Sequence, residues 1–485
     1  MVRRTVKMAG SATGGDNRTQ ATDTLIMPDH AIPAPLLADR LRTHAGELLR
    51  LAAPVIVSRA GLVVMMAVDT AIVGRYSAQE LAYYGLAHLP ANLLVTTGVG
   101  LMMGVVAVTA HALGAGQDAE CGRVWRRAIP YALLLGILFA LASLAGESFF
   151  RLTGQSADLA AGGGQVMAVL GYGMPGMMLY VATGFFLEGL KRPIPGMVAM
   201  ILGNLLNALL AWMLVWGHGG FPALGAVGSA WATTAVRWGM GLGLLFYAWH
   251  MSDHARWAVR DPVRDWWSGS RKQRHLGYAA GVSLGVESGA FATLGLFAGM
   301  ISPLALGAYT VGLNLTALPF MAAVGLASAT AVRVGVAYGR RDPLDMALAG
   351  WTGLGVTSLI LAGVGVLYRW MPEPLAAIYS ADPQLIAAVA PLIAFTAWVL
   401  VADGGQVVMA NALRGRGDAW VPTALHFISY AVVMIPVSAL LAFGLERGAR
   451  GLFEGILIAS VVSVTILSLR FALLSRPRPA KAGGH

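Results

Sequence analysis

Residues 51–73 read LAAPVIVSRAGLVVMMAVDTAIV, an apolar stretch interrupted by only two ionisable side chains, Arg59 and Asp69. A helix needs about 20 residues to cross the roughly 30 Å hydrocarbon core of a bilayer, so this stretch is long enough for one span. A charged group inside such a span is costly and needs a partner or a function. The stretch therefore predicts a membrane helix whose ionisable residues have a partner or a function.

The composition extends this prediction to the whole chain. Of the 485 residues, 57% are hydrophobic and 12% are charged, and the mean hydropathy is +0.66. Soluble proteins carry about a quarter charged residues, so water is excluded as the main surroundings of this surface. The net charge of +10 does not indicate a nucleic-acid partner, because the basic residues fall in loops between apolar runs and form no single patch.

Apolar runs of span length recur twelve times and predict an all-α polytopic membrane protein. They lie near residues 50–74, 89–113, 127–146, 165–190, 195–217, 223–250, 276–301, 313–338, 348–370, 384–413, 420–444 and 452–473. The polar segment 251–275 separates the first six runs from the last six. It reads as a linker between two halves.

The two halves share sequence elements at one spacing. AYYGLAHL from Ala82 matches AYTVGLNL from Ala308, and LEGLKRP from Leu187 matches LRGRGDA from Leu413, each at an offset of 226 residues. A unit of six spans returns the chain to the side where it began, so the halves are predicted to be parallel repeats, two six-helix bundles with a cavity between them. The predicted divisions are an N-terminal tail (1–47), an N-terminal bundle (48–250), a linker (251–275), a C-terminal bundle (276–473) and a C-terminal tail (474–485).

The basic residues predict the orientation in the membrane. With a cytoplasmic N-terminus, the inner loops and tails would hold about 25 Lys and Arg residues and the outer loops about five. The positive-inside rule therefore places both tails and the linker in the cytoplasm. The segment 1–47 lacks the continuous apolar core of a cleaved signal peptide, so it is expected to stay as a tail.

Energy for transport is predicted to come from an ion gradient. No GxxxxGK[ST] motif for nucleotide phosphates occurs in the chain, and no metal or nucleophile cluster stands at the edge of a span. The sequence thus favours a transporter over a membrane enzyme, with no cofactor beyond a coupling ion. One elementary charge moved through 100 mV supplies roughly 2.3 kcal/mol.

Three carboxylates lie deep enough in the predicted spans to bind that ion: Asp69, Glu287 and Asp403. Each could take up a proton or a sodium ion, a hard cation that prefers oxygen ligands. None has an acidic counterpart in the other repeat. Glu287 and Asp403 belong to the same half, so they are predicted to form one site that could hold Na⁺. The alternative is structural: the acids would form buried ion pairs with Arg59, with Arg237 or with each other.

Polar neighbours and a proline are predicted to support Asp69. Asn204, Asn207 and Thr233 are the expected partners, although an Asn among apolar residues equally serves as an interhelical hydrogen-bond partner. Pro54 lies on the same helix and could couple ion binding to a bend, or simply form a static kink.

These elements together resemble the multidrug and toxic compound extrusion family, in particular its NorM-like branch. The resemblance rests on four segments and covers about residues 48–475 in order. They are LAAPVIVSRAGLVVMMAVDTAIVGRYSAQELA from Leu51, LMMGVVAVTAHALGAGQ from Leu101, GVESGAFA from Gly285 and ADGGQVVMANALRGRGD from Ala402.

The resemblance implies a monomeric exporter in a bacterial inner membrane that exchanges cationic or amphipathic compounds, such as drugs, for H⁺ or Na⁺. Asp69, Glu287 and Asp403 match the ion-linked carboxylates of that family, and Asn207 matches the first of two polar positions in the fifth helix. The second position is Ala211 here, which weakens the expectation of a sodium site in the first half. The alternative with the same layout is a flippase for a lipid-linked saccharide, which would favour a strongly basic cavity.

Overall fold

The computed structural model describes residues 34–379 and 382–475, and their secondary structure is helical. Most of the predicted tails, residues 1–33 and 476–485, lies outside the described residues. The first helix begins at Ala34, earlier than the predicted end of the N-terminal tail at residue 47. From Leu41 onward the described residues form one compact unit, to which the following description applies.

The helices of the first half end before the predicted linker. In chain order they are α1 (Ala34–Tyr76), α2 (Ala78–Gly114), α3 (Asp118–Leu144), α4 (Gly146–Leu152), α5 (Ala157–Tyr172), α6 (Met174–Gly189), α7 (Ile194–Trp216), the short 3₁₀ turn η1 (His218–Gly220) and α8 (Gly225–Trp249).

The helices of the second half follow the linker. They are α9 (Arg271–Ile301), α10 (Pro303–Gly339), α11 (Pro343–Trp370), α12 (Pro372–Ala377), α13 (Pro383–Gly415), α14 (Trp420–Phe427), η2 (Ile428–Met434), α15 (Ile435–Ala439), η3 (Leu440–Gly444) and α16 (Gly448–Ser475). The predicted span 420–444 is a succession of α and π turns, because η2 and η3 are π-helical.

Most of these helices have the dimensions of membrane spans. In the described part of the chain, ten helices are long and apolar enough to cross a membrane. Helices α5 and α6, which meet at a bend of 42°, count as an eleventh candidate span if they are taken together. The predicted run 165–190 is therefore a broken helix. The remaining predicted span, 223–250, corresponds to α8, which is 25 residues long but is made more polar by Arg237 and the buried Thr233 and Thr234.

Corresponding turns in the two halves have the same geometry. α2 and α10 are both 37 residues long, and each begins after a serine, Ser77 or Ser302, whose hydroxyl accepts a hydrogen bond from the backbone N–H three residues on. After α2 the chain turns through Gly116 with φ 71°, and after α10 through Arg341 with φ 61°. A side chain in this left-handed region costs roughly 1–2 kcal/mol, so Arg341 is strained where its counterpart is glycine.

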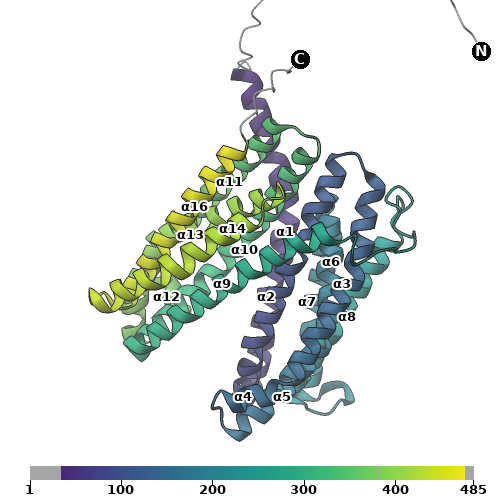
Figure 1. The fold of residues 1–485 in the computed structure, drawn as a ribbon. Coiled ribbons are helices and arrows are strands. Elements are labelled where there is room, and N and C mark those ends of the chain that lie inside the picture. The colour runs from purple at the N-terminus through teal and green to yellow at the C-terminus, as the bar shows by residue number, and fades with distance from the viewer. Residues whose placement is uncertain (1–33, 380–381, 476–485) are drawn as a thin grey trace, which may run out of the picture. The chain divides into compact units, whose positions relative to one another are not determined.

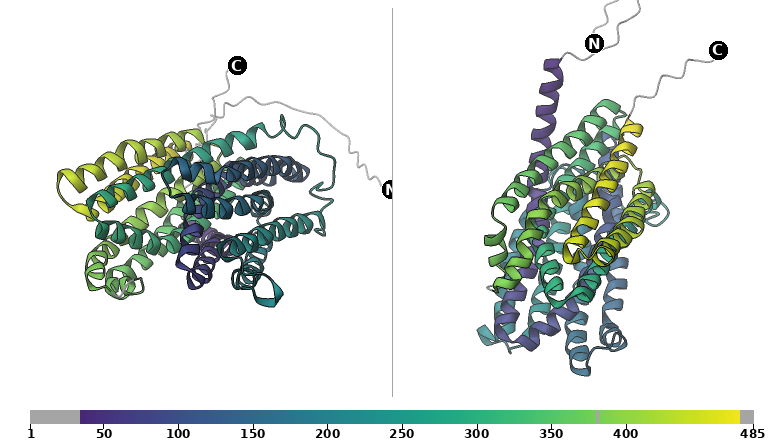
Figure 2. Two further views of the ribbon diagram at one scale, coloured as in Figure 1. Left: turned by 90° about the horizontal axis from the view of Figure 1, so that it is seen from below. Right: turned by 90° about the vertical axis from the view of Figure 1, so that its left-hand side faces the viewer.

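The two halves lie beside each other and meet along α2. Figure 1 shows α3 and α5 to α8 on the right and α11 to α16 on the left, and the view from below in Figure 2 keeps the two groups apart. Helix α2 packs on both α9 and α10. A Cβ atom at Gly104 would collide with the carbonyl of Gln273, and one at Gly114 with that of Val336. The backbones are therefore in direct contact at the C-terminal half of α2.

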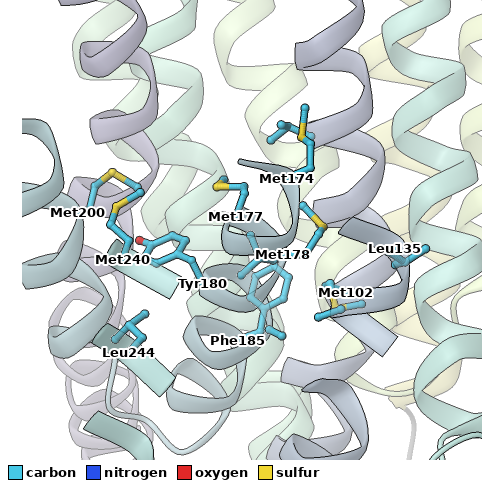
Figure 3. Close-up of a cluster of buried hydrophobic side chains, with 14 of the residues drawn as sticks. Met102, Leu135, Met174, Met177, Met178, Tyr180, Phe185, Met200, Met240 and Leu244 are labelled. Carbon is cyan, nitrogen blue, oxygen red and sulfur yellow. The ribbon is translucent and has the colours of Figure 1, made fainter. Parts of the chain in front are cut away.

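The core of the first half is rich in methionine. Figure 3 shows the thioether side chains of Met174, Met177 and Met178 on α6 between those of neighbouring helices, including Met200 and Met240. Unbranched, polarisable methionine side chains fill irregular gaps and repack readily.

The linker packs back on the first half. Trp257 is buried, and its carbonyl lies where a side chain at position 122 would be, so Gly122 permits the contact. Arg192 donates two hydrogen bonds to Asp253, at 3.0 and 2.7 Å. The Arg192 guanidinium holds the pKa of the Asp253 carboxyl below its usual value.

Candidate functional site: two acidic centres among the spans

The first centre forms around Asp69 on α1. The Asn207 amide on α7 donates to Asp69 Oδ1 at 2.7 Å, and the Thr233 hydroxyl on α8 donates to Oδ2 at 2.9 Å. Asp69 is only 1% exposed. Neutral donors from two neighbouring helices therefore occupy one position on each carboxylate oxygen, and the structure brings these three predicted residues together.

Asn204, the fourth residue predicted for this centre, does not bind Asp69. Its amide donates instead to the carbonyl of Met200, one turn back on α7, at 2.9 Å. Gly61 of α1 lies against Met200 and Asn204, so this part of α7 contacts α1 well before Asp69. Asn204 and Asn207, three positions apart on α7, thus meet different parts of the neighbouring helix in this structure.

Unpartnered oxygens surround the Asp69 carboxylate. Within the described residues, Asn207 Oδ1, Ser229 Oγ and the Tyr84 hydroxyl are buried without a hydrogen-bond partner. Ser229 and Tyr84 both lie near Asp69 without forming a hydrogen bond to it. Buried polar atoms are rarely left unpaired, so this centre has unused capacity to bind a cation or water. Sequence analysis missed Ser229 and Tyr84, although Ser229 lies one helical turn before Thr233.

A small cavity of about 80 Å³ adjoins Asp69. Its lining combines polar side chains with four methionines: His88, Asn92, Thr233, Arg237, Met65, Met66, Met177 and Met240. The Arg237 guanidinium donates to the carbonyl of Leu170 at 3.3 Å. It forms no ion pair with Asp69, so in the described part of the chain Asp69 has no Lys or Arg within ion-pair distance.

The second centre joins four elements of the second half. Asp403 on α13 accepts hydrogen bonds from Gln406 at 3.2 Å and from Ser460 on α16 at 3.3 Å. The same Gln406 amide donates to the Tyr430 hydroxyl on η2 at 2.6 Å. Glu287 on α9 adjoins Tyr430 and interacts electrostatically with Asp403. The two predicted acids thus belong to one polar network.

A buried arginine lies close to this network. Arg414, at the end of α13, interacts electrostatically with Glu287 and donates to Ser283 of α9 at 2.9 Å. Sequence analysis missed Gln406, Tyr430 and Ser460. Gln406 could have been found, because it follows Asp403 by three residues and so shares its helix face.

Neither centre is a conventional multivalent metal site. In the described residues, no three His, Cys, Asp or Glu side chains converge in the manner of metal ligands. The Glu287 and Asp403 pair can supply carboxylate oxygens, and the Asp69 centre can supply carboxylate, amide and hydroxyl oxygens. Both sets suit a proton or a hard monovalent cation.

Arg59, offered as a partner for Asp69, pairs with another acid. Its guanidinium lies 3.1 Å from Glu188 at the end of α6, and Glu188 also accepts from Ser328 of α10 at 2.6 Å. This buried network links α1 and α6 with the second half. Sequence analysis used Glu188 only as part of the repeat element LEGLKRP.

The helix with Asp69 is continuous through Pro54. No break in α1 occurs at this residue, and the Ser58 hydroxyl donates to the Pro54 carbonyl at 3.0 Å. A proline has no N–H to bond the preceding turn, so this is a weak point in the hydrogen bonding of α1.

The chain is similar to multidrug resistance proteins along most of its length. It is 41% identical over 454 residues to a probable multidrug resistance protein NorM of Caulobacter vibrioides, covering 92% of this chain and 96% of that protein. It is 31% identical over 454 residues to the multidrug resistance protein PmpM of Pseudomonas aeruginosa, covering 90% and 93%.

Solved structures share the fold. The crystal structure of the eukaryotic MATE transporter AtDTX14 matches with a TM-score of 0.82 at 21% identity, covering 90% of this chain and 97% of that chain. An outward-facing multidrug resistance MATE family transporter of the MOP superfamily matches with a TM-score of 0.79 at 20% identity, covering 90% and 98%.

The MatE family model matches this chain twice, over residues 54–213 and 279–440. Together with the close relatives, this match identifies a polytopic membrane protein, and the chain belongs to the MatE family of multidrug and toxic compound extrusion proteins.

Proposed function

We propose that this protein is an antiporter of the bacterial inner membrane that exports amphipathic or cationic small molecules in exchange for H⁺ or Na⁺. The observation that carries this proposal is the buried Asp69 carboxylate, hydrogen-bonded from α7 and α8 beside a cavity lined by methionines. An ionisable group at such a depth marks an ion pathway more often than a structural contact. The names of the relatives support multidrug export as the cargo class.

The proposed architecture is two parallel six-helix bundles. The two segments matched by the family model begin at residues 54 and 279, close to the repeat offset, and the turns after α2 and α10 have matching geometry. We take α8 as the remaining span, because it packs on α6 and α7 and supplies Thr233 to Asp69. Both ends of the chain are then cytoplasmic, and the protein acts as a monomer.

Direct backbone packing between halves supports a state closed towards the cytoplasm. The contacts of Gly104 and Gly114 with α9 and α10 lie at the ends of helices that meet the predicted inner loops. Alternating access would separate these contacts while one bundle rocks against the other. The Arg59, Glu188 and Ser328 network would have to break in the same movement, because it joins both halves.

Coupling follows if cation binding and cargo binding favour opposite states. An ion can shift the equilibrium only by its difference in affinity between the two states, and by linkage the cargo shifts the ion's affinity equally. If Asp69 or Asp403 loses its hydrogen bonds when one bundle rocks against the other, its affinity for the ion would differ between the two states. No cofactor takes part in this cycle.

Purified protein in liposomes loaded with ethidium tests the proposal. We expect efflux when a pH or sodium gradient is imposed, with each gradient applied separately to identify the ion, and none without a gradient. Failure to move any organic cation under either gradient would overturn the proposal. Movement of a polyprenyl-linked saccharide in the same liposomes would then favour the flippase, which the acidic centres do not support.

A further inference from the structure

A large cavity lies where the two halves meet, and its lining includes none of the residues of the two acidic centres. Its volume is about 860 Å³. Its walls come from the C-terminal ends of α2, α10 and α16, the turn after α13 and the first turns of α3, α9 and α11. We call it the junction pocket. None of its lining residues has a role in the transport proposed above.

Three cations in the junction pocket lack acidic partners. Lys272, Arg341 and Arg416 line it, and none of them forms an ion pair with an Asp or Glu of the described residues. The Arg416 Nε is buried and has no hydrogen-bond partner there. Arg341 holds a left-handed backbone conformation at a position where the first repeat has Gly116. A strained residue that persists in a cavity points to a function.

The two carboxylates of the pocket are already engaged. Glu120 pairs with Arg123 at 2.7 Å and with Arg127 at 3.4 Å. Asp342 caps α11 by accepting a hydrogen bond from the backbone N–H of Asp345 at 2.9 Å. The three unpaired cations therefore outnumber Asp342, the one pocket carboxylate without an ion pair among the described residues, so the pocket carries a net positive charge that favours an anion.

One side of the pocket is apolar. Leu473 and Leu474 of α16, Met346 of α11 and Val108 of α2 line it, and Leu473 is 59% exposed on the outer surface of its helix. A small inorganic anion gains nothing from apolar side chains, whereas the acyl chain of a lipid packs against them. Anionic phospholipids are enriched in the cytoplasmic leaflet, and basic pockets between transmembrane helices on that side bind their headgroups.

We propose that the junction pocket binds the phosphate headgroup of an anionic phospholipid, with Lys272, Arg341 and Arg416 around the phosphate and the acyl chain along Leu473. The inference relies on the cytoplasmic orientation proposed above but on no part of the coupling mechanism.

Lipid in this pocket stabilises the packed junction of the two halves. Its walls come from both halves, and beside it the His111 imidazole of α2 donates to the carbonyl of Gly415 of α13 at 2.6 Å. A ligand that contacts both halves binds only while they are together, so it favours that state by mass action.

Lipid binding to the purified full-length protein in detergent tests the proposal. Native mass spectrometry is used to titrate dioleoylphosphatidylglycerol, dioleoylphosphatidylcholine, glycerol 3-phosphate and inorganic phosphate. The pocket variant is Lys272→Gln with Arg341→Gln and Arg416→Gln. The matched control removes three exposed cations elsewhere, Arg50→Gln with Arg260→Gln and Arg264→Gln.

We expect phosphatidylglycerol to bind the wild type and the control equally and the pocket variant roughly tenfold more weakly. Phosphatidylcholine and the two soluble phosphates should bind none of them at matched concentrations. Wild-type affinity in the pocket variant, equal loss in the control or equal binding of phosphatidylcholine would overturn the proposal. Binding of inorganic phosphate that depends on the same three cations would reassign the pocket to a soluble phosphate.

Arg341→Gly separates lipid binding from folding. Glycine adopts the left-handed backbone conformation without the steric strain of a side chain. The lipid-free variant should therefore melt at a higher temperature than the lipid-free wild type. Loss of the guanidinium should at the same time weaken phosphatidylglycerol binding by roughly fivefold. A variant that is more stable and binds lipid as well as the wild type would overturn the role of Arg341. This readout holds even if the protein transports nothing.

Discussion

The two acidic centres differ in how their charge is balanced. Asp69 is a single carboxylate whose two oxygens each accept a hydrogen bond from a neutral side chain, and it is almost fully buried. Glu287 and Asp403 are two carboxylates in one network, and the direct donors to Asp403 lie at the longer distances of 3.2 and 3.3 Å. The first half thus encloses one well-bonded charge, whereas the second half gathers two charges with fewer donors.

This difference in charge balance leads us to expect different roles for the two centres in ion coupling. Two negative charges close together in a medium of low dielectric repel each other, so a bound cation or a shared proton would stabilise the second centre. The single carboxylate of the first centre accepts hydrogen bonds from Asn207 and Thr233 and has no second carboxylate to repel it. We expect the second centre to dominate coupling and the first to tune it.

The largest effect is expected from Glu287→Gln and Asp403→Asn. Each change removes one of the two charges whose repulsion draws in the cation, so gradient-driven efflux from liposomes should fall to the level of empty liposomes. Substrate binding to the purified variants should stay within a few fold, because neither the fold nor the cargo surface changes. Efflux against a gradient is compared with binding measured by fluorescence.

The double variant tests whether the second centre is needed for coupling at all. Glu287→Gln with Asp403→Asn should show the same background efflux as either single change, because loss of either acid already disables the shared site. Near-normal uphill efflux in the double variant would leave Asp69 as the only coupling carboxylate and refute the comparison drawn above.

The next effect is expected from Asp69→Asn. An asparagine can retain the hydrogen bond from Thr233 but carries no charge, so efflux should fall by roughly tenfold or more while membrane insertion stays normal. Removing an intramembrane charge relieves a desolvation cost, which should keep the variant folded. Loss of insertion, judged by the yield of monodisperse protein, would mean that Asp69 acts as a structural contact.

Sequence analysis captured the features that depend on local composition. The spans were predicted from hydropathy, because a long run of apolar residues is stable in the hydrocarbon core of a membrane. Asp69 was grouped with Asn204, Asn207 and Thr233 as polar residues of the same half, and of these Asn207 and Thr233 donate hydrogen bonds to it. Both inferences needed no knowledge of how the helices pack.

What sequence analysis missed depends on packing between distant segments. Glu188 stands next to Lys191 and Arg192, which suggests a charge in water, but Arg59 and Ser328 bury it from two other helices. Tyr430 reaches the second centre from a π-helical turn, whose register a regular helix pattern does not predict. The break between α5 and α6 likewise interrupts one continuous apolar run.

A smaller effect is expected from Asn207→Ala. The change leaves Asp69 Oδ1 without its donor in a buried site, which typically costs about 1–3 kcal/mol of stability. The melting temperature of the purified protein should fall, and the gradient needed for half-maximal efflux should rise. A variant as stable and active as the wild type would show that Thr233 alone holds Asp69.

The smallest effect is expected from Asn204→Ala, which is the matched control for Asn207→Ala because both change the same residue type on α7. The Asn204 amide bonds only the carbonyl of Met200, and that carbonyl also accepts the backbone N–H of the helix, so no buried acceptor is left unpaired. Alanine in addition favours the helix. Efflux and melting temperature should therefore stay close to wild-type values in the same liposome and thermal unfolding assays. If Asn204→Ala instead lowers efflux as much as Asn207→Ala, the donor set around Asp69 must change during transport and recruit Asn204 in another state. The contrast between a fixed first centre and a charge-driven second centre would then no longer hold.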